Sequence, residues 1–377
     1  MKILVQIKAM AAVAFLVAAC SLFLSAQEKG FNKRGNTLIA DQFNNRVIEV
    51  DRQGNVVWQF GLGPADFSPA SIIGTNDAQR VGDLTLMAGT GTPGGQPEAP
   101  NCTNPSGCPD NRVLLVDRDG NIVWQYGQFG VAGSGPDQLN VPVQNTWLPN
   151  SHVLITDQAN ERVIEVDVAT KAIVWQYGTT GVSGNGPEQL NNPNSAELLA
   201  NGHILISDEN NNRALEVTRA GNIVWQYGSG DPNINDPVSG VAFASRLENG
   251  HTLITDSNHA RIVEIDRDKN VVWEYFTCTG SGCNLARGTG PLPTRALRLR
   301  NSHTLISDQY NHRVIEVNHG KQIERTFGKL GDLGYNTESV ADGGLNSPYD
   351  AKRIGDYTGL TPPFGGDGEG DNGQGDD

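Results

Sequence analysis

The stretch that decides the fold is residues 35–61, which read GNTLIADQFNNRVIEVDRQGNVVWQFG, because this phrase returns along the whole chain. Four further copies are complete and one is split by an insertion; they occupy residues 152–178, 203–228, 251–275 and 303–328, and 85–89 with 111–127. Self-similarity at a spacing of about fifty residues indicates a repeat architecture. The six copies therefore predict six similar structural units.

Columns of matching residues run through these copies. In five of them an aspartate is followed by an arginine five residues later and by a glutamate eight residues later; the aspartates are Asp41, Asp157, Asp208, Asp256 and Asp308. The aromatic column is Trp58, Trp124, Trp175, Trp225 and Trp273, with Arg325 in the sixth copy. Residues that form contacts between repeated units recur in every unit, whereas the residues of a single catalytic site differ from one unit to the next. We therefore interpret the charged columns as buried pairs that hold the turn between the second and third strands, and the tryptophans as packing between units.

Each copy contains three short β-branched runs bounded by Gly, Asn or Asp, and a fourth run precedes it, as at 142–148, 193–199 and 293–299. Four strands in each unit are typical of a propeller blade. The first copy lacks its leading run, and a matching run lies at 346–354. The sequence thus predicts an all-β, six-bladed β-propeller with four-stranded blades, in which the C-terminal inner strand pairs with the N-terminal blade and closes the ring.

Both ends of the chain differ from the repeats. Lys2 and Lys8, an apolar run and Leu24-Ser25-Ala26 are typical of a signal peptide over residues 1–26. An alternative is lipoprotein processing, with the chain anchored to a membrane at Cys20. We expect the propeller to span 27–360 and the acidic, glycine-rich residues 361–377 to be disordered.

Charge and cysteine content narrow the partners and the compartment. The formal net charge of −14 disfavours nucleic acid as a partner, since phosphate backbones would be repelled. Beyond the N-terminal segment the cysteines are even in number: Cys102, Cys108, Cys278 and Cys283. Two local disulfides are the simplest pairing, with a zinc site as the alternative. We expect a secreted or periplasmic monomer.

The connections between copies carry a family pattern. YGQFGVAGSGPDQLNVP followed by HVLITDQANERVIEVD resembles the NHL-repeat propellers, in which a glycine-rich link leads into a strand that ends in Asp and then into Asn-x-Arg. NHL propellers include protein- and RNA-binding modules as well as lyases. The closing VVWQYG is also similar to arylsulfotransferase and quinoprotein-type propellers. Arylsulfotransferases carry inner-strand histidines, and the inner strands PVQNTWLPN and PNSAELLAN have none.

The segments that differ most between the repeats, in which we expect the functional residues, lie on one face of the predicted ring. The insertion at 89–110 lies in a connection between the second and third strands of its blade, and the link with Cys278 and Cys283 emerges on the same side. These two loops come from roughly opposite blades, so we expect them to stiffen or rim the channel mouth. His152, His203, His251 and His303 recur at one position around the ring, and we interpret them as structural rather than metal-binding.

Inner-strand residues that vary from blade to blade are the candidate ligand site, because they converge on the central channel. They are Gln144, Asn145, Asn194, Ser195, Thr294, Arg295, Tyr349 and Asp350. Arg295 and Asp350 belong to adjacent blades and are predicted to lie close together, either as a structural ion pair or as part of a site. Catalytic and metal-binding residues stay unassigned. We expect no cofactor, with Ca²⁺ bound by Asn and Asp oxygens at the channel mouth as the alternative.

Two functions are consistent with this sequence. The first is an exported recognition scaffold that presents its loop-rich face to a protein or glycan, since no nucleophile–base or metal constellation is apparent in the sequence. The alternative is a periplasmic or extracellular enzyme, a lyase, hydrolase or sulfotransferase, with a channel-centred and Ca²⁺-dependent site that uses Arg295 and Asp350.

Overall fold

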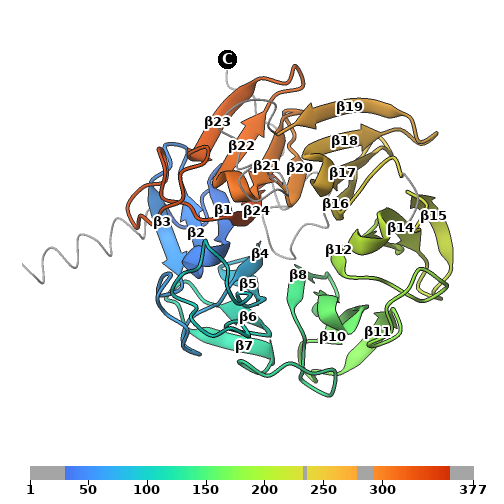
Figure 1. Ribbon diagram of the computed structural model, residues 1–377, viewed down its shortest axis with the longest axis horizontal. Helices are drawn as coiled ribbons and strands as arrows, with labels where there is room; N and C mark the ends of the chain where they lie inside the picture. Colours follow the sequence, from blue (N-terminus) through green and yellow to red (C-terminus); the bar gives the residue numbers. More distant parts are fainter. Residues whose placement is uncertain (1–29, 232–235, 278–291, 357–377) are drawn as a thin grey trace, which may run out of the picture.

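The computed structural model describes residues 30–356 apart from 232–235 and 278–291, and within them six four-stranded antiparallel sheets form a ring (Figure 1). The six-bladed β-propeller is confirmed. Strands β24, β4, β8, β12, β16 and β20 lie nearest the central axis, one from each blade. No helix in the described part of the chain has the length and apolar character to cross a membrane.

Each blade contains four strands, which are named here from the axis outward. Blade one contains β24 (Pro348–Arg353), β1 (Thr37–Asp41), β2 (Arg46–Val50) and β3 (Val56–Phe60). Blade two contains β4 (Thr75–Val81), β5 (Leu84–Gly89), β6 (Arg112–Val116) and β7 (Ile122–Gly127). Blade three contains β8 (Pro142–Trp147), β9 (His152–Asp157), β10 (Arg162–Asp167) and β11 (Ile173–Tyr177).

The second half of the ring repeats this arrangement. Blade four contains β12 (Pro193–Leu198), β13 (Ile204–Asp208), β14 (Arg213–Val217) and β15 (Ile223–Tyr227). Blade five contains β16 (Val241–Arg246), β17 (Thr252–Asp256), β18 (Arg261–Ile265) and β19 (Val271–Phe276). Blade six contains β20 (Arg295–Arg298), β21 (Thr304–Asp308), β22 (Arg313–Val317) and β23 (Ile323–Gly328). Short 3-10 helices join the second and third strands of five blades: η1 (Gln42–Asn44), η2 (Gln158–Asn160), η3 (Glu209–Asn211), η4 (Ser257–His259) and η6 (Gln309–Asn311).

The ring closes as predicted. Strand β24 pairs antiparallel with β1, so that Arg353 lies opposite Thr37 and Asp350 opposite Ala40. Single blades cannot bury both faces of their sheets, and the core is accordingly divided into clusters between neighbours. In the cluster at the closure, Ile39 and Ile48 of blade one pack with Leu305 of blade six. The inner strand from the C-terminal end thus completes both a sheet and an interblade core.

The repeated aspartate–arginine pairs are structural, as predicted. The aspartate ends the second strand, the 3-10 helix follows, and the arginine begins the third strand, with Nε–Oδ2 distances of 2.7 to 2.8 Å in five blades. The residue between helix and arginine adopts positive φ, as Asn45 does at 49°. In blade two the insertion replaces this turn, and Arg112 pairs with Asp110 instead.

The prediction that the glutamate column holds the turn between the second and third strands is wrong. The glutamates lie on the third strand, away from this turn. Each of the four residues Glu165, Glu216, Glu264 and Glu316 has Oε1 at 2.6 to 2.8 Å from Nδ1 of the histidine that precedes or begins the second strand. These histidines are therefore structural, as predicted. The glutamates also bind an arginine of the next blade, as in Glu264–Arg298 at 2.8 Å. The glutamate column thus links neighbouring blades rather than holding the turn.

The tryptophans also act between blades, as predicted. The indole N–H of Trp58 donates to the carbonyl of Arg118 at 2.9 Å, and that of Trp273 donates to the carbonyl of His319 at 3.0 Å. In both cases the acceptor lies in the turn between the third and fourth strands of the following blade. The column therefore contributes a hydrogen bond as well as apolar packing to each such seam.

Candidate functional site at the ring centre

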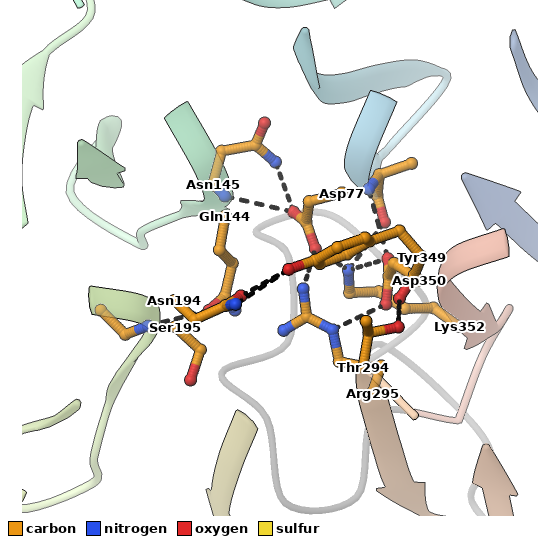
Figure 2. Close-up of polar contacts among 12 residues, drawn as sticks. Asp77, Gln144, Asn145, Asn194, Ser195, Thr294, Arg295, Tyr349, Asp350 and Lys352 are labelled. Carbon is orange, nitrogen blue, oxygen red and sulfur yellow. Dashed lines mark hydrogen bonds and ion pairs between the residues drawn. The ribbon is translucent and has the colours of Figure 1, made fainter. Parts of the chain in front are cut away.

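The inner strands bring charged side chains of three blades together at the ring centre (Figure 2). Arg295 of β20 lies 3.1 Å from Asp350 of β24, measured from Nε to Oδ1, which confirms that these residues of adjacent blades are neighbours. Arg295 Nη2 also donates to Asp77 of β4 at 3.0 Å. Lys352, two residues beyond Asp350 on the same strand, donates to Asp77 at 2.6 Å and to Asp350 at 2.5 Å. Two cations and two carboxylates thus form one cluster.

This central cluster is buried and balanced in charge. None of its four side chains is more than 6% exposed. Burial raises the pKa of Asp77 to about 6, against the lowering effect of Lys352 and Arg295. For Asp350, burial is outweighed by Lys352 and Arg295, which hold the pKa of its carboxyl below the usual value. Four buried polar atoms of the cluster and of Asn145 have no hydrogen-bond partner among the described residues: Arg295 Nε, Arg295 Nη1, Asp350 Oδ1 and Asn145 Oδ1. Arg295 Nε and Asp350 Oδ1 contact each other as the ion pair at 3.1 Å.

The remaining predicted site residues hydrogen-bond to the central cluster, to one another or to nearby groups. Asn145 donates to Asp77 at 2.7 Å, which attaches β8 to the central cluster. Asn194 donates to the hydroxyl of Tyr349 at 2.8 Å across the ring. Thr294 donates to the carbonyl of Tyr349 at 2.6 Å.

Two predicted residues point to their neighbours rather than to the central cluster. Gln144 accepts from the backbone N–H of Ala196 at 2.8 Å, and Ser195 donates to Ser207 at 2.7 Å. The structure therefore unites Asn145, Arg295 and Asp350 in one network and joins Asn194 to Tyr349 in a second (Figure 2).

Asp77 and Lys352 were not predicted from the sequence. The sequence nevertheless contains a signal for each of them. Lys352 follows Asp350 by two residues, and side chains at that spacing on a strand share a face. Asp77 lies opposite Ala88, as Asp350 lies opposite Ala40, so the register of the split copy would have located it. Blade two was obscured because its inner strand TNDAQRV lacks the leading proline of β8, β12 and β24.

The insertion of blade two extends across the loop-rich face toward blade six. Its Cys102 and Cys108 form the predicted disulfide. Gln96 donates to the hydroxyl of Tyr310 in η6 at 3.1 Å, and the carbonyl of Glu98 accepts from Asn346 at 2.7 Å. The insertion thus passes over the closure of the ring, on the side where it was expected to rim the channel mouth. Cys278 and Cys283 lie outside the described residues.

A chain of amides connects three blades beneath this insertion. Gln309 of η6 donates to Gln42 of η1 at 2.7 Å, and Gln42 donates to Asn76 of β4 at 2.8 Å. All three side chains are at most 5% exposed. These two hydrogen bonds join blades six, one and two through buried side chains.

Six four-stranded blades with a charged, self-paired centre define the chain as a closed β-propeller. The sequence model of the family described as outer membrane protein assembly factor BamB matches residues 109–331, more than half of the 377 residues, and the chain belongs to this family. Membership of a propeller family is confirmed at this level, and the narrower NHL assignment stays a prediction. A search of the curated proteins found no match.

Solved structures show the same fold at low sequence identity. A Bacteroides caccae protein of unknown function has 13% identity and a TM-score of 0.53, over 79% of this chain and 97% of its own. Virginiamycin B lyase from Staphylococcus aureus has 14% identity and a TM-score of 0.48, over 78% of this chain and 80% of its own. At these identities the likeness to the first structure supports the fold alone.

Proposed function

We propose that this protein is an exported recognition scaffold that binds a protein partner through the face bearing the disulfide-linked insertion. The observation that carries the proposal is the insertion itself, residues 89–110, which breaks the sixfold repeat and is held in place at two points. The disulfide constrains it near blade two, and the contacts of Gln96 and Asn346 hold it against the ring closure. A pre-ordered loop loses less conformational entropy on binding than a free one.

Exposed apolar side chains on the same face support this proposal. The links between blades emerge beside the insertion and present Leu62, Val131, Val182, Leu333 and Tyr335, which are 41 to 64% exposed. Large apolar residues in exposed loops are typical of protein-binding surfaces. A glycan-binding face, the other ligand class expected from the sequence, would instead be dominated by polar groups and aromatic platforms.

The ring centre is better explained as structural than as catalytic. Arg295 and Asp350 are the residues on which the alternative enzyme depends, and both contribute to the central ion cluster. Because its two carboxylates are already matched by two cations, the cluster offers no excess negative charge to Ca²⁺. This arrangement supports a scaffold without a cofactor.

Export and a partner in the cell envelope fit the remaining observations. A disulfide between Cys102 and Cys108 is typical of an oxidising compartment, and the N-terminal residues resemble a signal peptide. The family is described as an outer membrane assembly factor, which makes a protein partner in the envelope the favoured ligand for this chain.

Site-specific photocrosslinking in intact cell envelopes tests the proposal. A benzophenone side chain at exposed Thr103 in the insertion is expected to give a discrete crosslinked species, and one at exposed Asp268 on the opposite face is expected to give none. Replacing residues 89–111 by Asp-Gln-Ala-Asn-Glu, the turn of blade three, keeps an aspartate for Arg112 and should abolish crosslinking from neighbouring Leu62. Equal crosslinking from both faces, or crosslinking from Leu62 that survives this replacement, would overturn the proposal.

A further inference from the structure

The seam between blades six and one differs from the other seams of the ring. In blades one, four and five the column tryptophan lies under an arginine from the inner strand of the next blade. The distances from the guanidinium carbon to the ring centroid are 4.4 Å for Arg80 over Trp58, 4.8 Å for Arg246 over Trp225 and 5.1 Å for Arg298 over Trp273. At the closure the equivalent pair is Arg325 and Arg353, because Arg325 occupies the tryptophan position. Two cations thus replace a cation and an aromatic ring.

A cavity of about 360 Å³ is present at this seam. Five arginines line it: Arg34, Arg52, Arg300, Arg325 and Arg353. They come from the segment before β1, two turns, β23 and β24, all at the end of the ring opposite the insertion. The acidic groups in the lining are Glu316 and Asp356. The cavity therefore has a surplus of positive charge within a chain whose net charge is −14.

The existing contacts leave much of this positive charge unmatched. Arg353 binds Glu316 at 2.6 Å through Nη2 and donates to the carbonyl of Gly35 at 3.0 Å through Nη1. Arg353 is only 7% exposed, and its buried Nε has no hydrogen-bond partner among the described residues. The guanidinium groups of Arg34, Arg52 and Arg300 form no ion pair with any described residue. Burial, and then the nearby Arg325, lower the pKa of Arg353 against the effect of Glu316.

We propose that this cavity, lined by Arg34, Arg52, Arg300, Arg325 and Arg353, binds a tetrahedral oxyanion, a phosphate or sulfate group carried by a small ligand. Guanidinium groups bind such oxyanions through paired N–H donors, and several around one cavity can replace the hydration of the anion. Its volume lies within the range of about 300–1,000 Å³ of small-molecule sites. The site is distinct from the proposed protein-binding face and does not depend on it.

Calorimetric titration of the full-length protein with inorganic phosphate and, separately, with sulfate at low ionic strength tests this site. We expect binding at one site per chain, weakening with added NaCl. Arg325→Trp restores the residue of the other five blades and fills the cavity, so it should weaken binding at least tenfold without lowering the melting temperature. Arg52→Ala should also weaken binding, whereas Arg267→Ala, at the same turn position in blade five, should not.

The titration is repeated with the five acidic residues of 357–377 changed to amides, because that segment could compete for the same arginines. Binding that requires Arg325 in either background supports the site. If phosphate binds more tightly than sulfate, the natural ligand carries a phosphate group, and the reverse order indicates a sulfate group. Absence of binding in both backgrounds, or binding that is unchanged by Arg325→Trp, overturns the proposal.

Discussion

The seam between blades five and six and the seam between blades six and one are built from the same repeat and each contains an apolar cluster, but they differ in the side chains at their outer and inner ends. At the first, Trp273 is 6% exposed and packs under Arg298, and Phe243 near the axis lies 4.3 Å from the Arg295 guanidinium. At the second, the outer position is Arg325 beside the arginine-lined cavity. Near the axis this closure seam has the ion pair of Arg295 and Asp350.

This difference shows where the ring can depart from its repeat. Five seams must associate through interblade contacts alone, and in each of them the column tryptophan packs in or against the interblade apolar cluster. The closure seam has additional support, because blade one itself is completed by β24 from the far end of the chain. We infer that this strand pairing relieves the closure seam of the need for a tryptophan, so that the position could acquire a charged residue and a cavity.

The largest loss of stability is expected when the charge of Lys352, at the inner end of the closure seam, is removed. Lys352→Met leaves Asp77 and Asp350 buried at the centre with Arg295 as their remaining cation. Loss of one partner of a buried ion cluster costs about 3–5 kcal/mol, so the urea midpoint should fall by a corresponding amount. Adding Asp77→Asn should restore part of the loss, because it removes the unmatched carboxylate. Equal effects of the single and double variants would contradict the pairing.

The outer ends of the two seams should respond unequally to truncation. Trp273→Ala removes a buried ring and its hydrogen bond to the carbonyl of His319, and we expect a loss of about 3 kcal/mol in the free energy of unfolding. Arg325→Ala removes a partly exposed side chain next to a cavity and should cost less than about 1 kcal/mol. Urea unfolding of the two variants checks the ratio. A loss at Arg325 as large as that at Trp273 would show that both seams depend on their column residue.

Much of the fold could be predicted because each blade repeats the same local rules. The Asp41-to-Arg46 spacing recurs with the same turn, and the missing inner strand of blade one could be matched to residues 346–354. The adjacency of Arg295 and Asp350 followed from the order of the blades. The glutamate column was placed wrongly because its partners, a histidine thirteen residues earlier and an arginine of the next blade, lie outside the turn that was considered.

The arginine-lined cavity could not be predicted in the same way. Arg325 was visible as a departure from the tryptophan column, but one departure does not show what surrounds it. Arg34 precedes the first repeat and Arg300 lies in a turn, so no shared register connects them with Arg353. Their convergence depends on the closure of the ring, which brings the first and last parts of the chain to one seam. Only the three-dimensional structure shows the resulting surplus of positive charge.

The smallest expected effect concerns the acid stability of the closure seam. Burial alone would raise the pKa of Glu316, but Arg353, His303, Asn301 and Arg325 outweigh it and hold the pKa below the ordinary value of 4.5. Because the folded-state pKa is the lower one, Glu316 contributes stability above about pH 4.5 that is lost as the pH falls through its folded-state pKa. Glu316→Gln should therefore be less stable than the wild type at pH 7, with a difference that shrinks as the pH falls below 4.5. Urea unfolding at pH 7 and at successive lower pH values measures the difference, and a constant difference would mean that Glu316 stabilises the seam through packing rather than charge.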